Sequence, residues 1–412
     1  MRICLSLTRP AYGISGPSDA SHVKEWNDIW LHTMTGFHEE AFQELRNHKG
    51  DPEFENATLT LDEMSLKSYL NYDPKLKRNF GYVDHGGNTN ITGSNEIATD
   101  ALVVMLVSMR GRWKLPLGYM LTKSITADVQ AGIIREALRR SFDAGVRVRV
   151  LTMDGTAHNT STYKALGCNL LPTKISGMKV DFPHPHKDAN YRIYGMLDPP
   201  HMIKLVRNIL AEYWELYWPG KGMVKWAYIV RLQETQKAHQ GVRLANKITN
   251  KHISYKANKM KVYLATQLFS RSVAKSLRWC HEQNVPGFES KDVLVTAEFV
   301  SLHNDLFDVL NSRALTGKGL KAALTVDNLH IAQETFRKFE QLYDVLQGPD
   351  GKKVIHSRRK TGPLGFISCI KTVEKLVADM KKGILPLQHL RCYRLQQDSD
   401  CIKFLKSYHE NA

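Results

Sequence analysis

The sequence predicts an α/β domain with a mixed sheet, interrupted by a large and mostly helical block. Three observations support this class. Strand-like segments dominate residues 57–155. From about residue 201 to residue 388, apolar residues instead recur at spacings of three and four, as in amphipathic helices. A last short element at 395–408 follows the block, and this order suggests an insertion between a sheet and its final helix rather than a simple tail.

Five segments of the first part have the apolar character of strands. The run 101–109 is apolar throughout, which is typical of a buried strand. Residues 126–144 have helical spacing instead, and Gly145 suits the end of that helix. Several early strands, a helix and a further strand indicate a mixed sheet. The predicted strands are 57–64, 79–84, 101–109, 117–122 and 146–153.

Helices are expected before the strands and throughout the later block. Residues 23–45 have helical spacing and would pack on the core as part of an N-terminal remnant. A turn-rich basic loop occupies 348–359. The helices predicted for the block are 201–218, 262–284, 292–310, 325–346 and 365–382.

Composition restricts the class of partner. The net charge is +16, with 57 Lys and Arg against 41 Asp and Glu. This surplus favours a polyanionic partner, nucleic acid first, although a basic surface without a particular partner is the alternative. No segment approaches the run of about 18 apolar residues that crosses a membrane, and we recognise no signal peptide. Six cysteines without a CxxC pair indicate a reducing compartment and argue against a cysteine-based zinc site.

Two aspartates close strand-like segments. Asp62 lies in LTLDEMSLK, and Asp154 lies in VLTMDGTAHN. Two strand-terminal carboxylates of one sheet can converge on a pair of magnesium ions about 4 Å apart, which activate a water or a 3′ hydroxyl and stabilise the leaving phosphate oxygen. A solvated turn acid is the alternative for Asp62, and an ordinary Asp-Gly turn is the alternative for Asp154.

The segment 198–208, DPPHMIKLVRN, has the pattern of a phosphate site at a helix start. Its two prolines suit the first helical positions. Lys204 and Arg207 lie on the first turns, where a nucleotide phosphate could bind, and Asp198 could hold magnesium on that nucleotide. An ordinary proline-started amphipathic helix is the alternative. The sequence contains no GxxxxGK[ST] motif, so it is not a P-loop GTPase.

Two other groups of polar residues receive no catalytic role. His184, His186 and His201 form a loose cluster without a fourth ligand, which disfavours zinc. Asp305 and Asp308 lie in an apolar helical pattern that core packing explains.

Taken together, the motifs resemble those of the P-element transposase family, which includes the THAP-domain transposases. Each motif alone is weak, but eight occur in the family's order over about residues 25–405. They are LDEMSLK at 61–67, GYVDHG at 81–86, WKLPLGY at 113–119, MDGTAHN at 153–159, DPPHMIKLVRN at 198–208, DLFDVLNSR at 305–313, RKTGPLGF at 359–366 and RLQQDSDCIKF at 394–404.

The resemblance implies a fold and a set of site residues. The expected fold is an α/β RNase H-like mixed sheet interrupted by a large, mostly α-helical insertion domain that binds GTP. Asp62 and Asp154 correspond to the first two of three acids that bind Mg²⁺. Asp198, Lys204 and Asn208 are the expected contacts of GTP and its magnesium, and GTP in this family supports assembly on DNA.

The third acid is where the chain departs from the family pattern. The family reads roughly Gln-Asp-x-x-Glu, whereas this chain has Cys401 at the position of the Glu. A neutral thiol has no carboxylate oxygen and is a soft ligand, so phosphoryl transfer should be severely reduced. Asp398 is the candidate substitute. Asp400 is adjacent, but on a helix it is turned by about 100° from Cys401.

The resemblance also divides the chain into parts. Residues 1–54 would be the N-terminal helical remnant, without the Cys/His pattern of a THAP finger, and 55–197 the first part of the RNase H-like fold. Residues 198–388 would hold the insertion and the return helices, with an internal boundary near 290–315. Residues 389–412 would be a truncated C-terminal helix, so we expect a truncated or degenerate copy or a partial gene product.

The leading interpretation is therefore a P-element-like transposase core, ancestrally catalysing magnesium-dependent hydrolysis and strand transfer of DNA, and now impaired or inactive. Its partners would be transposon ends and target DNA in the nucleus, with a homo-oligomer conceivable and no membrane involved. Two alternatives stay open. One is a non-catalytic, transposon-derived DNA- or partner-binding protein, and the other is a GTP-binding regulatory protein built on the insertion.

Overall fold

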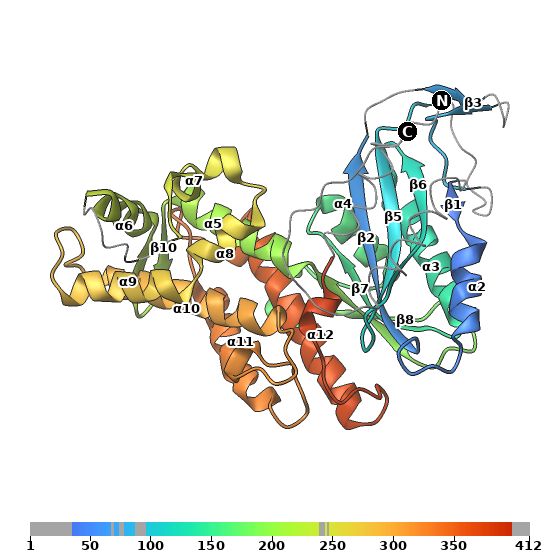
Figure 1. Cartoon of the computed structure of the whole chain (residues 1–412). Helices are drawn as coiled ribbons and strands as arrows, with labels where there is room; N and C mark the ends of the chain where they lie inside the picture. Colours follow the sequence, from blue (N-terminus) through green and yellow to red (C-terminus); the bar gives the residue numbers. More distant parts are fainter. Residues whose placement is uncertain are drawn as a thin grey trace, which may run out of the picture.

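The computed structural model describes residues 35–66, 70–73, 78–86, 96–238, 244 and 247–397. Figure 1 shows the chain in two parts, a sheet with its helices on one side and a helical block on the other. The red helix α12 (Thr361–Lys381), which ends the block, lies between these parts. The chain thus leaves the sheet, builds the block and returns to the sheet.

A seven-stranded mixed sheet forms the first part, with the strand order β1-β6-β5-β2-β7-β9-β8. The pairs β2–β5 and β5–β6 are antiparallel, whereas β2–β7 and β7–β9 are parallel. Antiparallel neighbours on one side of β2 and parallel ones on the other side make this the RNase H-like mixed sheet expected from the sequence. The strands are β1 (Gly36–Phe37), β2 (Asn56–Ser65), β5 (Asp100–Ser108), β6 (Lys114–Thr122), β7 (Arg147–Met153), β8 (Asp181–Pro183) and β9 (Arg192–Leu197).

Most elements predicted for the first part are confirmed, with small shifts at their ends. The predicted helix 126–144 is α3 (Ala127–Asp143), and the Thr126 side chain caps it by accepting from the Val129 amide. The predicted strand 79–84 is wrong in extent. Only β4 (Arg78–Phe80) is a strand there, pairing with β3 (Asn71–Asp73), and Tyr82 and Asp84 form single bridges.

Of the helix predicted over 23–45, the described part is confirmed from residue 39 on, whereas residues 35–38 are not helical. Residues 23–34 lie outside the described residues, and α2 begins only at Glu39 and ends at Asn47. Gly36 and Phe37 instead pair with the edge of β6. A Cβ atom at Gly118 of β6 would lie 2.0 Å from the Gly36 carbonyl oxygen, so the close pairing depends on a glycine at that place. Tertiary pairing here overrides local helical spacing.

The helical block contains the predicted helices with three corrections. The predicted helix 201–218 ends at Tyr213, because Trp214 has a φ of 67°, and a hairpin of β10 (Glu215–Trp218) and β11 (Gly222–Lys225) follows. The predicted helix 262–284 is broken at Ser270, which caps its second half. Of the predicted element 395–408, residues 398–408 lie outside the described residues, and a short 3₁₀ turn ends at Leu395. The helices are α4 (Ala157–Leu166), α5 (Pro199–Tyr213), α6 (Trp226–Ala238), α7 (Asn250–Ile253), α8 (Val262–Leu268), α9 (Arg271–Glu282), α10 (Asp292–Leu310) and α11 (Leu329–Val345), and the 3₁₀ turns are η1 (Ile175–Gly177), η2 (Tyr255–Asn258), η3 (Gly319–Lys321), η4 (Val354–His356) and η5 (Cys392–Leu395).

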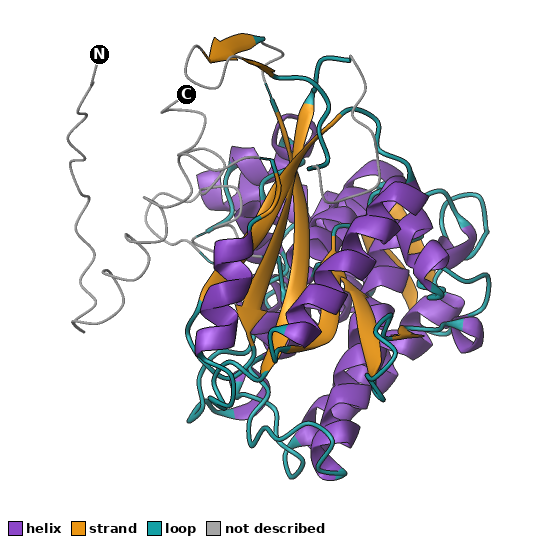
Figure 2. Cartoon of the chain, turned by 90° about the vertical axis from the view of Figure 1, so that its right-hand side faces the viewer, coloured by secondary structure: helices purple, strands orange, loops and turns teal. Residues whose placement is uncertain are grey.

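Helices cover both faces of the sheet (Figure 2), and β9 shows this directly. A Cβ atom at Gly195 would lie 2.6 Å from the Tyr163 ring of α4, whereas the neighbouring Tyr194 donates a hydrogen bond to Asp379 of α12. The Thr372 hydroxyl of α12 also donates to the Gly195 carbonyl oxygen at 2.9 Å. Helix α12 is therefore an integral layer of the sheet domain.

Small residues allow α12 to cross α5 closely. A Cβ atom at Gly365 would lie 2.1 Å from the Met202 sulfur, and one at Gly362 would lie 3.0 Å from the Leu205 Cβ atom. Because these positions lack side chains, the first helix after β9 and the last helix of the block pack against each other. Across the described residues, we find no helix with the combined length and apolarity of a bilayer-spanning segment.

Tyr163 ties two central strands together, so Tyr163→Phe should destabilise the fold. Its fully buried hydroxyl lies 2.9 Å from the Leu151 carbonyl oxygen of β7 and 2.7 Å from that of Met196 on β9. Removing the hydroxyl leaves buried acceptors with lost partners, which costs about 1–3 kcal/mol. Urea unfolding should show the loss, and Tyr263→Phe at a half-exposed position is the matched control. Equal midpoints for both variants would contradict this role.

Candidate functional site: two carboxylates at the ends of parallel strands

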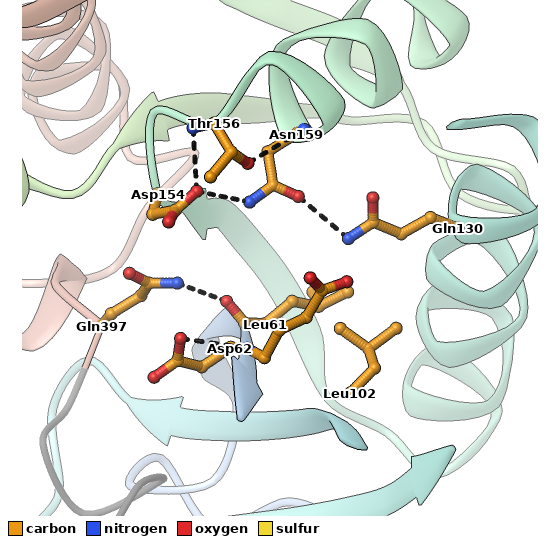
Figure 3. A pocket seen from close by; sticks show the side chains of 9 residues that line it. Leu61, Asp62, Leu102, Gln130, Asp154, Thr156, Asn159 and Gln397 are labelled. Atoms are coloured by element: carbon orange, nitrogen blue, oxygen red, sulfur yellow. Dashed lines mark hydrogen bonds between the residues drawn. The ribbon is translucent and has the colours of Figure 1, made fainter. Parts of the chain in front are cut away.

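The register of two parallel strands places Asp62 next to Asp154. Thr60 of β2 pairs with Thr152 of β7, and each aspartate follows two residues later. Side chains two residues apart in a strand point to the same face, so both carboxylates leave the sheet in the same direction. Both line one pocket, with Glu63, Gln130 and Gln397 among its other polar residues (Figure 3). The convergence of Asp62 and Asp154 that we expected from the sequence is therefore present.

A chain of hydrogen bonds fixes the orientation of the Asp154 side chain (Figure 3). Its Oδ1 atom accepts from the Thr156 amide at 2.9 Å and from the Asn159 side chain at 2.7 Å. Asn159 in turn accepts from Gln130 of α3 at 3.0 Å, and Gln130 accepts from the Thr162 hydroxyl at 2.7 Å. Buried polar partners of this kind hold a carboxylate in one geometry.

Asp62 lies in an electrostatically unfavourable place. Burial raises its pKa to about 6, and the negative charges of Asp154 and Asp198 add to this rise. His201 and the hydrogen bond from the Glu63 amide oppose the shift. The pKa of Glu63 is also raised by burial and by the carboxylates around it. A cation in the pocket would relieve this crowding of negative charge.

Asp198 and His201 extend the acidic site to the start of α5. The Asp198 side chain is only 2% exposed and caps the helix, accepting from the His201 amide at 3.1 Å. The His201 ring bridges the two parts, with Nδ1 3.0 Å from Asp198 and Nε2 3.9 Å from Asp154. Lys204 is buried as well. Burial lowers its pKa, against the attraction of Asp198, Asp154 and Asp62.

The three residues predicted to contact the nucleotide therefore lie in different surroundings. Asp198 and Lys204 lie beside the Asp62–Asp154 pair, whereas Asn208, one turn further along α5, accepts a hydrogen bond from Arg207 at 2.7 Å.

The last described residues bring the chain back to this pocket. The Leu395 carbonyl oxygen accepts from the Thr152 hydroxyl at 2.6 Å. The Gln397 amide donates to Asp198 at 3.0 Å, and its side chain donates to the Leu61 carbonyl oxygen (Figure 3). Asp398 and Cys401 lie outside the described residues, but the segment that leads to them ends in the pocket.

The other polar residues singled out in the sequence lie elsewhere. His184 and His186 pack beside Phe142, away from His201 in the acidic site, so the three histidines do not form one cluster. Asp305 pairs with Arg271, and Asp308 accepts from Asn304. The helix that carries both acids packs its apolar residues in the core, as predicted.

The pocket suits magnesium as far as its described residues go. Two convergent carboxylates offer the hard oxygen ligands that Mg²⁺ prefers, and one of them is unfavourably charged without a cation. Within the described residues, no three His, Cys, Asp or Glu side chains form a metal-binding group. A third protein ligand of these types would therefore come from outside the described residues.

Sequence reasoning missed Gln130, and it placed neither His201 beside Asp154 nor Gln397 in the pocket. Gln130 had a signal, because it is a polar residue on the buried face of α3, between apolar Ala131 and Val129. The other two could not be found, since their partners are distant in sequence.

Family models match both parts of the chain. Residues 33–167 match the TNP-like RNase H N-terminal domain, and residues 200–323 match the TNP-like GTP-binding insertion domain. Together these matches cover more than half of the chain. The fold and the carboxylate pair thus define an RNase H-like transposase domain with a helical insertion. The chain belongs to the P-element transposase family.

Two curated relatives and one solved structure agree with this assignment. The Homo sapiens protein named DNA transposase THAP9 is 28% identical over 361 residues, which are 87% of this chain and 39% of the relative. The Transposable element P transposase of Drosophila melanogaster is 31% identical over 224 residues, which are 53% of this chain and 27% of the relative. The chain therefore spans well under half the length of either protein. The structure titled Drosophila P element transposase strand transfer complex has the same fold, with a TM-score of 0.74 at 21% identity over 94% of this chain and 79% of that chain.

The raised pKa of Asp62 predicts a pH-dependent stability. The folded state holds a proton up to about pH 6, whereas the unfolded chain releases it near 3.8. The free energy of unfolding should therefore fall as pH rises from about 4 to about 6, by up to about 3 kcal/mol. Without divalent metal, Asp62→Asn should remove this loss and make the protein more stable at pH 7.

Chemical unfolding of both proteins in a chelator, at pH 5 and pH 7, measures the effect. Glu282→Gln, at an exposed position on α9, is the control for loss of one negative charge. If Asp62→Asn and Glu282→Gln shift the unfolding midpoint equally, the crowding of charge at Asp62 is refuted.

Proposed function

We propose that the chain is a P-element-like transposase core that acts on DNA phosphodiesters with magnesium, and that its activity is impaired by the missing third carboxylate. The observation that supports this proposal most directly is the convergence of Asp62 and Asp154 on one pocket that also contains Gln397. Its substrates would be transposon ends and target DNA, as the names of the relatives suggest. A nuclear location and assembly as a homo-oligomer belong to the same proposal.

The chain's own residues would prepare the site. Asp62 and Asp154 would hold the magnesium ions, which when bound activate a water or 3′ hydroxyl and stabilise the leaving oxygen. Asn159 and Gln130 orient Asp154 for this purpose. Lys204, although buried, lies where its charge partly offsets the three surrounding carboxylates.

Cys401 is the proposed cause of the impairment. A protonated thiol offers magnesium no hard oxygen, so two carboxylates would have to hold what three hold in the family pattern. Asp398, three residues earlier, is the candidate substitute. The division of the chain into the four segments 1–54, 55–197, 198–388 and 389–412 is also part of this proposal.

Restoring the carboxylate tests the cause. Purified Cys401→Glu, given a P-type terminal repeat, Mg²⁺ and GTP, should cleave DNA at least about a hundredfold faster than the wild type, because metal stabilisation of the transition state is worth several kcal/mol. Gel analysis of labelled DNA ends measures the product.

Two variants control this experiment. Cys401→Ser should stay as slow as the wild type, and Asp154→Ala should abolish the gain when added to Cys401→Glu. Robust wild-type cleavage that Asp154→Ala abolishes would disprove the impairment and leave an active enzyme.

GTP binding by the insertion is supported by the match of residues 200–323. We propose Asp198, Lys204 and Asn208 as contacts, because α5 starts the matched segment. Asp198 caps α5 and Lys204 lies near three carboxylates, so both have electrostatic partners within the chain. Nucleotide binding would have to redirect them.

Titration with GTP separates these roles of Lys204. If Lys204 contacts a phosphate, Lys204→Ala should weaken GTP binding about tenfold or more, since a charge-assisted hydrogen bond is worth about 1.5–3 kcal/mol. Lys318→Ala, at an exposed position of the same insertion, should leave affinity unchanged. Equal affinities for wild type and Lys204→Ala would restrict Lys204 to balancing the acids.

A second candidate function is a non-catalytic protein that binds DNA or a partner. The net charge of +16 together with Cys401 favours it. DNA affinity that falls steeply with salt, without any product from Cys401→Glu, would select this reading.

A further inference from the structure

The positive charge of the chain is concentrated in one stretch of the insertion. Between residues 235 and 281 there are ten Lys and Arg and no Asp or Glu, against a net charge of +16 for all 412 residues. A surface that is merely basic would mix both signs, as the rest of this chain does. The described part of this stretch builds the end of α6 and then α7, η2, α8 and α9.

Three lysines of this stretch form what we call the lysine turn: Lys251 of α7, Lys256 of η2 and Lys259, which follows η2. All three side chains are exposed, and none forms an ion pair with a carboxylate that the structure describes. Exposed Met260 (68%) and Tyr263 (50%) lie directly beyond them. Unpaired cations with neighbouring apolar side chains are the usual composition of a surface that binds nucleic acid.

A buried arginine holds the lysine turn in place. The side chain of Arg207 on α5 is fully buried and donates to the Lys259 carbonyl oxygen at 2.7 Å. It reaches the Asn258 carbonyl oxygen as well, at 3.4 Å. The turn is therefore anchored to α5 through its backbone, which leaves its lysine side chains free to bind a partner.

The same helix begins at the carboxylate pocket. Asp198 caps α5 and accepts from Gln397 in the pocket, and Arg207 follows nine residues later, or about 14 Å along the helix. Figure 1 shows α7 and α8 beside α5 in the helical block. The lysine turn thus has a fixed position relative to Asp62 and Asp154.

We propose that the lysine turn binds the phosphate backbone of duplex DNA outside the catalytic pocket and fixes the position of that DNA relative to the carboxylates. This inference rests on the proposed action on DNA and adds a contact site to it. Lysine is a point charge that recognises phosphate without reading bases, so binding there should be independent of sequence. Three charges spread over α7, η2 and the residue after η2 fit a row of phosphates better than one nucleotide.

The test measures binding rather than cleavage. Full-length wild type and a triple variant, Lys251→Gln, Lys256→Gln and Lys259→Gln, are titrated with a fluorescent random-sequence DNA duplex over a series of salt concentrations. The variant should bind at least about tenfold more weakly at low salt, and its salt dependence should be shallower by about 2–3 in log–log slope, because each phosphate contact contributes about 0.9.

A matched variant removes the same charge elsewhere. Lys318, Lys381 and Lys382 are exposed and form no ion pair with a described carboxylate, and changing all three to Gln should alter affinity less than about threefold. Circular dichroism melting verifies that both variants are folded.

The possible outcomes distinguish a failure of the lysine turn as the DNA contact from a failure of the proposed action on DNA. If the wild type does not bind duplex DNA, both this inference and the proposed function fail. If the wild type binds and the two triple variants weaken binding equally, or not at all, only the lysine turn is refuted. If saturating GTP removes the difference between wild type and the lysine-turn variant, the turn holds nucleotide phosphates and the DNA contact is refuted.

Discussion

The parallel pairing of β2 with β7 is the constraint on which the rest of this molecule depends. It brings two carboxylates, 92 residues apart in sequence, out of the same edge of one sheet. Burial removes water from the Asp62 carboxylate and is the main reason that its pKa rises to about 6, and the neighbouring charge of Asp154 adds to this rise. The fold tolerates this arrangement because the backbone hydrogen bonds between the buried strands and the packing of α3, α4 and α12 hold the strands in place.

A second constraint is that the chain returns to the sheet after it has formed the helical block. Asp198 lies where the chain leaves the sheet, and Gln397 lies where the chain returns, yet the two are joined by a hydrogen bond of 3.0 Å. The close crossing of α5 and α12 makes this return possible, since Gly362 and Gly365 leave room for α5. The chain between Asp198 and Gln397, which contains the helical block, is therefore fastened at both of its ends beside the carboxylate pocket.

Helix α5 joins the two parts physically. Its N-cap and first two turns carry Asp198, His201 and Lys204, which lie near Asp62 and Asp154, and its middle carries Arg207, which anchors the lysine turn. A ligand that altered the position of α5 would act on the pocket and the lysine turn together. This shared helix therefore connects the proposed nucleotide contacts with the proposed catalytic pocket.

The sequence by itself determined the local elements whose patterns are strong. The apolar run of β5, the capped helix α3 and the proline-started α5 could all be read from residue order, because their propensity and burial agree. The order of motifs also indicated the family and singled out Asp62 and Asp154. Local spacing did not predict the ends of elements where contacts distant in sequence decide them. Examples are Gly36, which pairs with the edge of β6, and Trp214, where the helix ends before the hairpin.

Only the tertiary structure decided which side chains share a site. Gln130, His201 and Gln397 come from three separate elements, and nothing in their local sequence states that they meet at Asp154 and Asp62. The position of Lys204 on α5 beside Asp62 and Asp154 also could not be predicted, because those carboxylates lie on or directly after two strands that are distant in sequence. Sequence records spacing along the chain, whereas the chemistry of a site depends on distances through space, and these are fixed only when sheet and helices pack.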